Sequence, residues 1–124
     1  MSEQFELRSE FAFEAAHRLP AVAADHRCSR LHGHSYAVQV RVRGPLVEPY
    51  GWVLDLGSIE ANCERVRGEL DHRLLNDIPG LENPTSEVLA RWVWRSLIGE
   101  LPGISAVLVR ETASSWCIYR GPGA

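Results

Sequence analysis

The chain has 124 residues, of which 45% are hydrophobic, the size and composition of a single globular domain over residues 1–124. Its formal net charge of −3 argues against a general nucleic-acid binder. No apolar run approaches the ~18 residues of a membrane span, and no signal-peptide pattern opens the chain. We therefore expect a cytoplasmic protein with no membrane or nucleic-acid partner.

Four segments have the composition of strands. Residues 5–17 and 32–42 alternate between apolar and polar side chains, which is typical of half-buried strands. The stretch between them is small, polar and broken by Pro20, so it predicts a loop. Residues 104–110 and 116–119 are short β-rich runs and predict a closing pair of strands.

Two helices are predicted between these pairs of strands. Asp55 is a candidate N-cap for the first helix, and Asn83-Pro84-Thr85 offers cap chemistry for the second, which the 102–103 Pro-Gly pair ends. The first helix has an apolar stripe made of Ile59, Cys63, Val66 and Leu70, and the second has one made of Val88, Leu89, Trp92, Val93 and Leu97. The order β-β-α-α-β-β predicts an α+β domain in which two helices cover one face of an antiparallel four-stranded sheet.

Three histidines are the main candidates for chemistry. His32 and His34 lie two apart on one strand, so their side chains leave from the same face, and His17 ends the preceding strand. If the two strands pair as a hairpin, the three imidazoles converge at one end of the sheet. Three imidazole nitrogens suit Zn²⁺ and leave a fourth position open. The competing interpretation, three unrelated histidines, requires a coincidence of face and end, and His26 in the loop fits a solvated side chain.

Cys28 precedes the histidine pair by four residues, and two functions are open to it. It could be a fourth ligand that closes a structural zinc site. It could instead be a free thiolate beside the metal, favoured by Arg27 and Arg30, and then act as a general base. The spacing does not decide between the two.

Two further features contain titratable groups. Asp71 and His72 follow the first predicted helix and could form a proton-shuttling pair, or be a turn residue and a histidine favoured by the helix dipole. Glu111 shares a strand face with apolar residues, and a buried carboxylate needs partners. A ligand with two N–H donors would satisfy it, and so would Arg110 or Arg120.

Five segments together resemble a known family. They are Phe13-Glu-Ala-Ala-His17-Arg-Leu-Pro20, Cys28-Ser-Arg-Leu-His32-Gly-His34, Leu70-Asp71-His72-Arg-Leu-Leu75-Asn76-Asp77, Asn83-Pro84-Thr85-Ser86-Glu87 and Cys117-Ile-Tyr-Arg-Gly121. The chain resembles the 6-pyruvoyltetrahydropterin synthase family over nearly its whole length. Within the family it is most similar to the 6-carboxytetrahydropterin synthases of queuosine biosynthesis, which share the three-residue interval between Cys28 and His32.

The resemblance implies a fold, an assembly and a reaction. The fold would be the tunnelling fold (T-fold), whose protomers join into trimers that stack as a hexamer. The reaction would be that of a lyase, converting 7,8-dihydroneopterin triphosphate to 6-carboxy-5,6,7,8-tetrahydropterin with release of acetaldehyde and triphosphate. Alternatives that stay open are a 6-pyruvoyltetrahydropterin synthase and a non-catalytic module with a structural zinc site.

The resemblance also implies roles for individual residues. His17, His32 and His34 would bind Zn²⁺, Cys28 would be the base with Asp71-His72 as its partner pair, and Glu111 would anchor the pterin in a site between subunits. Residues 113–116 depart from the family pattern and leave the shape of the pterin pocket open. The triphosphate contacts do not follow from any motif, and Arg18, Arg27 and Arg30 are candidates by proximity.

Overall fold

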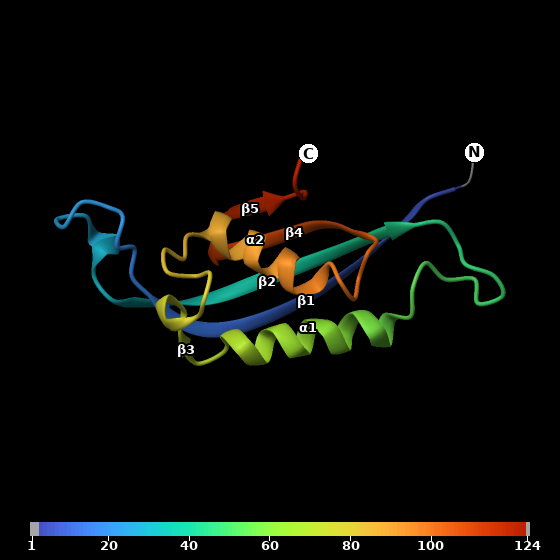
Figure 1. Cartoon of the computed structure of the whole chain (residues 1–124), viewed down its shortest axis with the longest axis horizontal. Coiled ribbons are helices and arrows are strands. Elements are labelled where there is room, and N and C mark those ends of the chain that lie inside the picture. Colours follow the sequence, from blue (N-terminus) through green and yellow to red (C-terminus); the bar gives the residue numbers. More distant parts are fainter. Residues whose placement is uncertain (1–2, 124) are drawn as a thin grey trace.

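A computed structural model describes residues 3–123, which form one sheet covered on one face by two helices (Figure 1). The strands are β1 (Phe5–His17), β2 (His32–Gly44), β3 (Arg73–Leu74), β4 (Ile104–Thr112) and β5 (Ser115–Tyr119). The helices are α1 (Leu56–Leu70) and α2 (Ser86–Leu97), and single 3-10 turns cover Arg27–Ser29 and Leu75–Asp77. The α+β class and the four strands expected from sequence are confirmed.

The hairpin of β1 and β2 forms the centre of the sheet. The two strands pair antiparallel over their full length, from Phe5 opposite Gly44 to His17 opposite His32. The apolar face of each strand lies under the helices, with Phe13, Val38 and Val40 almost completely buried. Because side chains alternate between faces, this register also fixes which residues meet at the far end of the hairpin.

The sheet has five strands rather than the four expected, in the order β3-β1-β2-β4-β5. The additional strand β3 pairs parallel to β1 at Ala15 and Ala16, so the sheet is not wholly antiparallel. A two-residue strand is too short to show alternation, and its pairing depends on where α1 ends in space. Sequence periodicity therefore could not identify it.

The helices begin where expected. The Asp55 side chain accepts a hydrogen bond from the Gly57 N–H at 2.9 Å, and the Thr85 hydroxyl accepts one from the Val88 N–H at 3.2 Å. The predicted stripe of α1 is buried. The buried residues of α2 are Leu89, Ala90, Val93, Trp94 and Leu97, with Val88 and Trp92 at the margin.

The end of α2 differs from the prediction. The helix stops at Leu97, capped by Ile98, about one turn before the 102–103 Pro-Gly pair that was expected to end it. Gly99 follows the cap and is a poor helix former, which explains the earlier stop.

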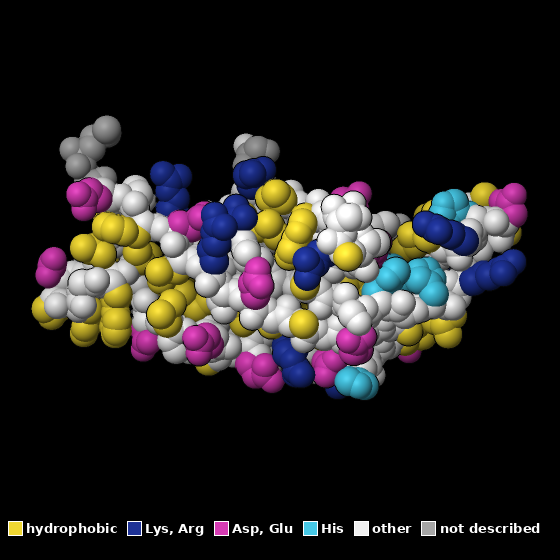
Figure 2. All heavy atoms as spheres, turned by 180° about the vertical axis from the view of Figure 1, so that it is seen from behind, with side chains coloured by type: hydrophobic (Ala, Val, Ile, Leu, Met, Phe, Trp, Pro, Cys, Tyr) yellow, Lys and Arg dark blue, Asp and Glu magenta, His cyan; other side chains and the backbone are white. Residues whose placement is uncertain are grey.

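The two ends of the molecule differ in chemistry. Figure 2 shows the molecule from behind, with histidine and arginine side chains gathered at one end and hydrophobic side chains at the other. The partly exposed hydrophobic side chains Phe5, Leu46, Tyr50, Trp52 and Leu56 line or border the hollow at the apolar end. None of the helices in residues 3–123 is both long enough and apolar enough to cross a bilayer.

Candidate metal centre and active site

The β1–β2 register brings the three predicted histidines together. His17 lies directly opposite His32, and His34 lies opposite Ala15, so all three project from one face at one end of the hairpin. One ring nitrogen of each histidine lies within 4.8 Å of a ring nitrogen of each of the other two. His17 is buried, whereas His32 and His34 are partly exposed. The cluster therefore has a closed side and an open side.

Main-chain carbonyls fix the tautomers of two of these rings. Nδ1 of His17 is 3.0 Å from the Pro84 carbonyl oxygen, and Nδ1 of His32 is 2.7 Å from the Arg30 carbonyl oxygen. A carbonyl oxygen only accepts, so each Nδ1 carries the proton and each neutral ring has a bare Nε2. The two Nε2 atoms face each other at 2.9 Å.

This geometry fits a divalent cation. Two lone pairs at 2.9 Å repel each other unless a proton or a metal ion lies between the rings. Burial lowers the pKa of His17, which favours the neutral form that binds a metal. A carbonyl acceptor on the other ring nitrogen is also the arrangement found around histidine ligands of zinc. The donor set therefore suits Zn²⁺ with three protein ligands.

Glu111 places an unpaired carboxylate oxygen beside the cluster. Its Oε2 lies 3.9 Å from Nε2 of His34 and 4.0 Å from Nε2 of His17. Within residues 3–123 this buried oxygen has no hydrogen-bond partner, and neither Arg110 nor Arg120 supplies one. Glu111 can therefore balance a bound cation or accept N–H donors from a ligand.

Cys28 lies in the 3-10 turn at the open side of the cluster. It lines a hollow of about 410 Å³ together with Arg27, His32, His34, Glu111 and Thr112. Its sulfur is outside the 4.8 Å group formed by the histidine nitrogens. The cysteine is thus next to the centre, at a position open to a ligand in the hollow.

His26 has a structural contact that sequence reasoning missed. Its Nδ1 accepts a hydrogen bond from the Cys28 N–H at 3.0 Å, so it caps the turn that presents the cysteine. The Cys28 carbonyl in turn accepts a hydrogen bond from the Leu19 N–H at 2.8 Å. A side chain that accepts a hydrogen bond from the N–H two residues ahead is a local pattern, so the sequence itself held a signal for this cap.

Asp71 and His72 make the direct contact that spacing alone did not establish. Nδ1 of His72 lies 3.0 Å from Oδ2 of Asp71. Oδ1 of Asp71 accepts a hydrogen bond from the Glu14 N–H at 3.0 Å, and the His72 N–H donates to the Glu14 carbonyl at 2.6 Å. The Glu14 N–H, and then His72, lower the pKa of Asp71. His72 adopts a left-handed backbone conformation with φ of 57°.

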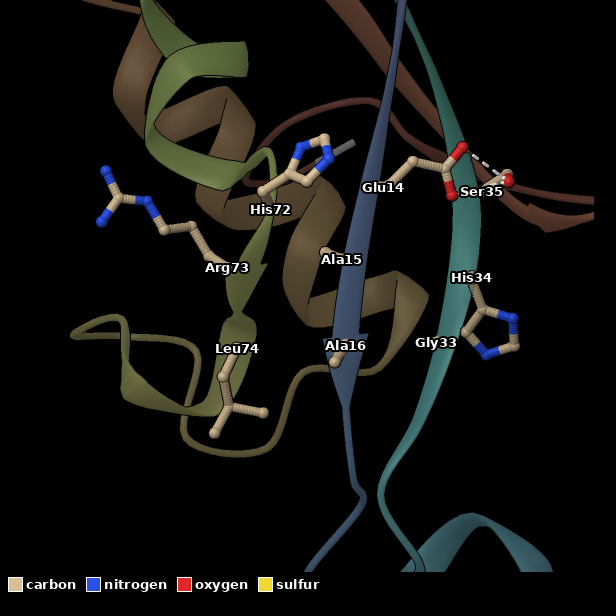
Figure 3. Close-up of a pocket in the computed structure, with 9 residues that line it drawn as sticks. All are labelled: Glu14, Ala15, Ala16, Gly33, His34, Ser35, His72, Arg73 and Leu74. Carbon is tan, nitrogen blue, oxygen red and sulfur yellow. Dashed lines mark hydrogen bonds between the residues drawn. The ribbon is translucent and has the colours of Figure 1, made fainter.

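His72 of the Asp71-His72 pair and Cys28 line different hollows of the same chain. His72, Arg73, Glu14, Ser35 and His34 are among the residues that line a hollow of about 530 Å³. In Figure 3, His72 and Arg73 lie on the β3 side of β1, Glu14 reaches across to the Ser35 hydroxyl on β2, and the His34 ring points away from β1. Cys28 is not among the lining residues of this hollow, and His72 is not among those of the Cys28 hollow. Among residues 3–123, only His34 lines both hollows.

Glu111 also reaches a third hollow of about 410 Å³, at the N-terminus of α2. Its other lining residues are Ser86, Glu87, Thr112, Ser115, Trp116 and Cys117. The guanidinium of Arg110 stacks over the Trp116 ring at 4.7 Å, so the segment that departs from the family pattern is held in place. This hollow is a second place from which a ligand could reach the Glu111 carboxylate.

Fold and site together define a small α+β protein with a histidine centre able to hold a metal ion. Residues 6–122 match the family model described as 6-pyruvoyl tetrahydropterin synthase, and the chain belongs to this family. The family resemblance expected from the five segments is therefore confirmed.

Individual relatives cover nearly the whole chain. A 6-carboxy-5,6,7,8-tetrahydropterin synthase from Synechocystis sp. is 40% identical, with 91% of each chain covered. One from Bacillus subtilis is 34% identical over 94% of this chain and 85% of its own. The solved structure of Caenorhabditis elegans 6-pyruvoyl tetrahydropterin synthase superposes with a TM-score of 0.88 at 26% identity, with 97% of each chain covered. These matches confirm the T-fold and the prediction that the chain is an enzyme of the pterin synthase type.

Proposed function

We propose that the chain is a zinc-dependent 6-carboxy-5,6,7,8-tetrahydropterin synthase acting in the cytoplasm on the route to queuosine. Its substrate would be 7,8-dihydroneopterin triphosphate, and it would release acetaldehyde and triphosphate. The observation that carries the proposal is the pair of bare imidazole nitrogens of His17 and His32, which face each other at 2.9 Å beside His34. The names of the two similar bacterial relatives support the choice of product.

Zn²⁺ would be held by His17, His32 and His34, and would supply Lewis-acid polarisation of substrate oxygens. Cys28 would accept a proton from the substrate side chain at the open side of the centre. The Asp71-His72 pair would move a proton on the other side of the reacting chain, with Asp71 orienting the His72 ring at 3.0 Å.

Glu111 would orient the pterin. Its buried Oε2 lacks a partner among the described residues, and the amino-pyrimidine edge of a pterin presents adjacent N–H donors to such a carboxylate. Arg18, Arg27 and Arg30 lie in or next to the loop that presents Cys28, so they are our candidates for triphosphate contacts. Unchanged KM values in their alanine variants would count against that assignment.

Product analysis tests the proposal. Zinc-loaded protein is incubated with 7,8-dihydroneopterin triphosphate, and the pterin product is identified by mass. We expect the 6-carboxy product together with acetaldehyde. A 6-pyruvoyl product would assign the chain to the reaction named for its C. elegans structural relative, and no turnover by the loaded protein would contradict both.

The structural-zinc alternative is tested by replacing Cys28. We expect Cys28→Ala to keep bound zinc and to lower kcat by roughly 10²–10⁴-fold, the contribution of a general base. Cys63→Ala is the matched control, because this buried thiol on α1 lines neither the Cys28 hollow nor the other two hollows near the centre. Simultaneous loss of zinc and of the folded state in Cys28→Ala would support a closed structural site instead.

A further inference from the structure

A buried tyrosine contacts the buried histidine of the candidate metal centre. Tyr36 follows His34 by two residues on β2 and is 1% exposed. Its hydroxyl oxygen lies 3.1 Å from Nδ1 of His17, on the ring edge that faces away from the other histidines. We infer that Tyr36 is a positioning residue, which holds His17 in the orientation and the tautomer required for metal binding. The inference rests on the proposed zinc centre.

The Tyr36 ring is fixed by its neighbours. It stacks on Phe13 with ring centroids 4.9 Å apart and an angle of 9° between the planes. It also meets the edges of His17 at 5.9 Å and His34 at 5.5 Å, both nearly perpendicular. A hydroxyl on so constrained a ring has one position available, so it can define the position of the imidazole that it contacts.

The hydrogen-bond roles at Nδ1 of His17 follow from its two oxygen neighbours. The Pro84 carbonyl at 3.0 Å requires an N–H, and the Tyr36 oxygen at 3.1 Å can accept a share of the same N–H. The opposite arrangement, in which Tyr36 donates to a bare Nδ1, would set a lone pair against the Pro84 carbonyl. It would also place the ring proton on Nε2, which is the nitrogen that faces His32.

Tyr36 and Pro84 thus act on the same ring from two different elements. Pro84 immediately precedes Thr85, whose side chain caps α2, and Tyr36 belongs to β2. Together they place an acceptor on each side of the Nδ1–H bond and leave Nε2 free for a metal ion. Outer partners of this kind contribute roughly 10–100-fold to metal affinity.

The test is the zinc affinity of Tyr36→Phe, measured by competition with a chromophoric chelator at fixed pH. Phenylalanine keeps the stack on Phe13 and removes only the hydroxyl. We expect zinc to bind about 10-fold more weakly, with a melting temperature of the metal-free protein close to that of the wild type. Tyr119→Phe is the matched control, since this tyrosine packs on Trp94 at 5.4 Å and belongs to β5; its zinc affinity should be unchanged.

Equal zinc affinities of Tyr36→Phe and the wild type would overturn the inference while leaving the zinc centre intact. A wild-type protein that is folded and binds no zinc would overturn the proposed function, and this inference with it. Should Tyr36→Phe fail to fold, long-range ¹H–¹⁵N correlations of zinc-loaded wild-type protein decide the question. We expect His17 to show a protonated Nδ1 and a metal-bound Nε2; coordination through Nδ1 would overturn the inference.

Discussion

The three histidines differ in how strongly the surrounding fold depends on each. His17 is 1% exposed, is hydrogen-bonded on one side to Pro84 and Tyr36, and is a buried polar residue of the core. His32 and His34 are partly exposed at the end of β2. Replacing His17 by alanine would take away the hydrogen-bond partner of the buried Pro84 and Tyr36 oxygens. Replacing His32 by alanine would expose little buried surface.

His32→Ala therefore separates metal binding from folding. We expect the variant to lose zinc, with an affinity loss larger than the roughly 10–100-fold that outer partners contribute. It should remain folded, because substitution at a partly exposed position costs about 0.5 kcal/mol. Metal content by mass spectrometry and far-UV circular dichroism check both points, and His72→Ala is the control because this exposed histidine lies outside the cluster. Unfolding of His32→Ala would show that the metal holds the fold together.

Glu111→Gln tests the role of the buried carboxylate. The amide keeps the size of the side chain and removes the charge, so charge-assisted hydrogen bonds to a pterin become ordinary ones. We expect the Kd for a pterin to rise roughly 10-fold, about 1.4 kcal/mol, with the protein still folded. Titration calorimetry measures this, with Glu10→Gln on the same sheet as the control. An unchanged Kd would remove Glu111 from the pterin site.

At the residue scale, sequence reasoning located side chains better than it located their partners. Alternation placed His17, His32 and His34 on one face, because two strands of regular period leave no other register for their apolar residues. It could not find the Pro84 carbonyl, which is main chain, nor the Tyr36 hydroxyl, since a tyrosine among valines resembles any core residue. The His26 cap was interpreted as a solvated side chain, although its short sequence distance from the Cys28 N–H was a usable signal.

At the scale of elements, the joint between α1 and β1 positions the candidate proton-transfer pair. Asp71 caps the C-terminus of α1, and both it and His72 bond to the main chain of Glu14 on β1. The same joint sets β3 beside β1. Two hydrogen bonds to Glu14 thus hold the end of α1, the strand β1 and the Asp71-His72 pair together.

Asp71→Asn should make stability less sensitive to acid. The folded-state pKa of Asp71 is lowered from its ordinary value of 3.8, so its ionised form stabilises the fold above that value. This contribution is lost as the pH falls from about 3.8 through the lowered pKa. We expect the urea midpoint of Asp71→Asn to lie below that of the wild type at pH 7, and the difference to shrink in acid. Asp25→Asn in the exposed loop is the control, and a constant difference at all pH values would contradict the assignment.

Elements long enough to show a sequence pattern were predictable, whereas the two-residue strand β3 was not. The bounds of β1 and the starts of both helices follow from alternation and from the Asp55 and Thr85 caps. The strand β3 has two residues and forms only because α1 delivers them to the edge of β1. The end of α2 depended on the weak propensity of Gly99, which a more prominent Pro-Gly pair downstream obscured.

At the scale of the molecule, the candidate catalytic groups of one chain are divided between two hollows. Cys28 lines one and His72 lines the other. The proposed reaction needs both groups at one substrate, which an assembly that apposes the two hollows would achieve. The hexamer that the family resemblance implies would have a mass of six times 13.9 kDa, about 83 kDa, which light scattering can measure.

Subunit complementation tests this arrangement. Cys28→Ala and His72→Ala are each expected to be inactive alone. When they are co-expressed, random mixing gives both intact groups to about one quarter of sites formed between subunits, so about a quarter of wild-type activity should return. The control is a mixture of the two variants, refolded together and kept at a concentration so low that the subunits stay monomeric. No recovery in mixed assemblies would place Cys28 and His72 of the same chain at each site.

The left-handed backbone at His72 lowers the thermal stability of the fold, whereas the proposed reaction requires a histidine at this position. A β-carbon at φ of 57° costs free energy that glycine would not, on the order of 1 kcal/mol. A library randomised at this codon and sorted only for survival on heating should therefore become enriched in glycine, whereas one sorted for turnover should return histidine. The two selections would thus favour different residues at position 72. The difference between the two sorted libraries would show that histidine is kept there for turnover and not for stability.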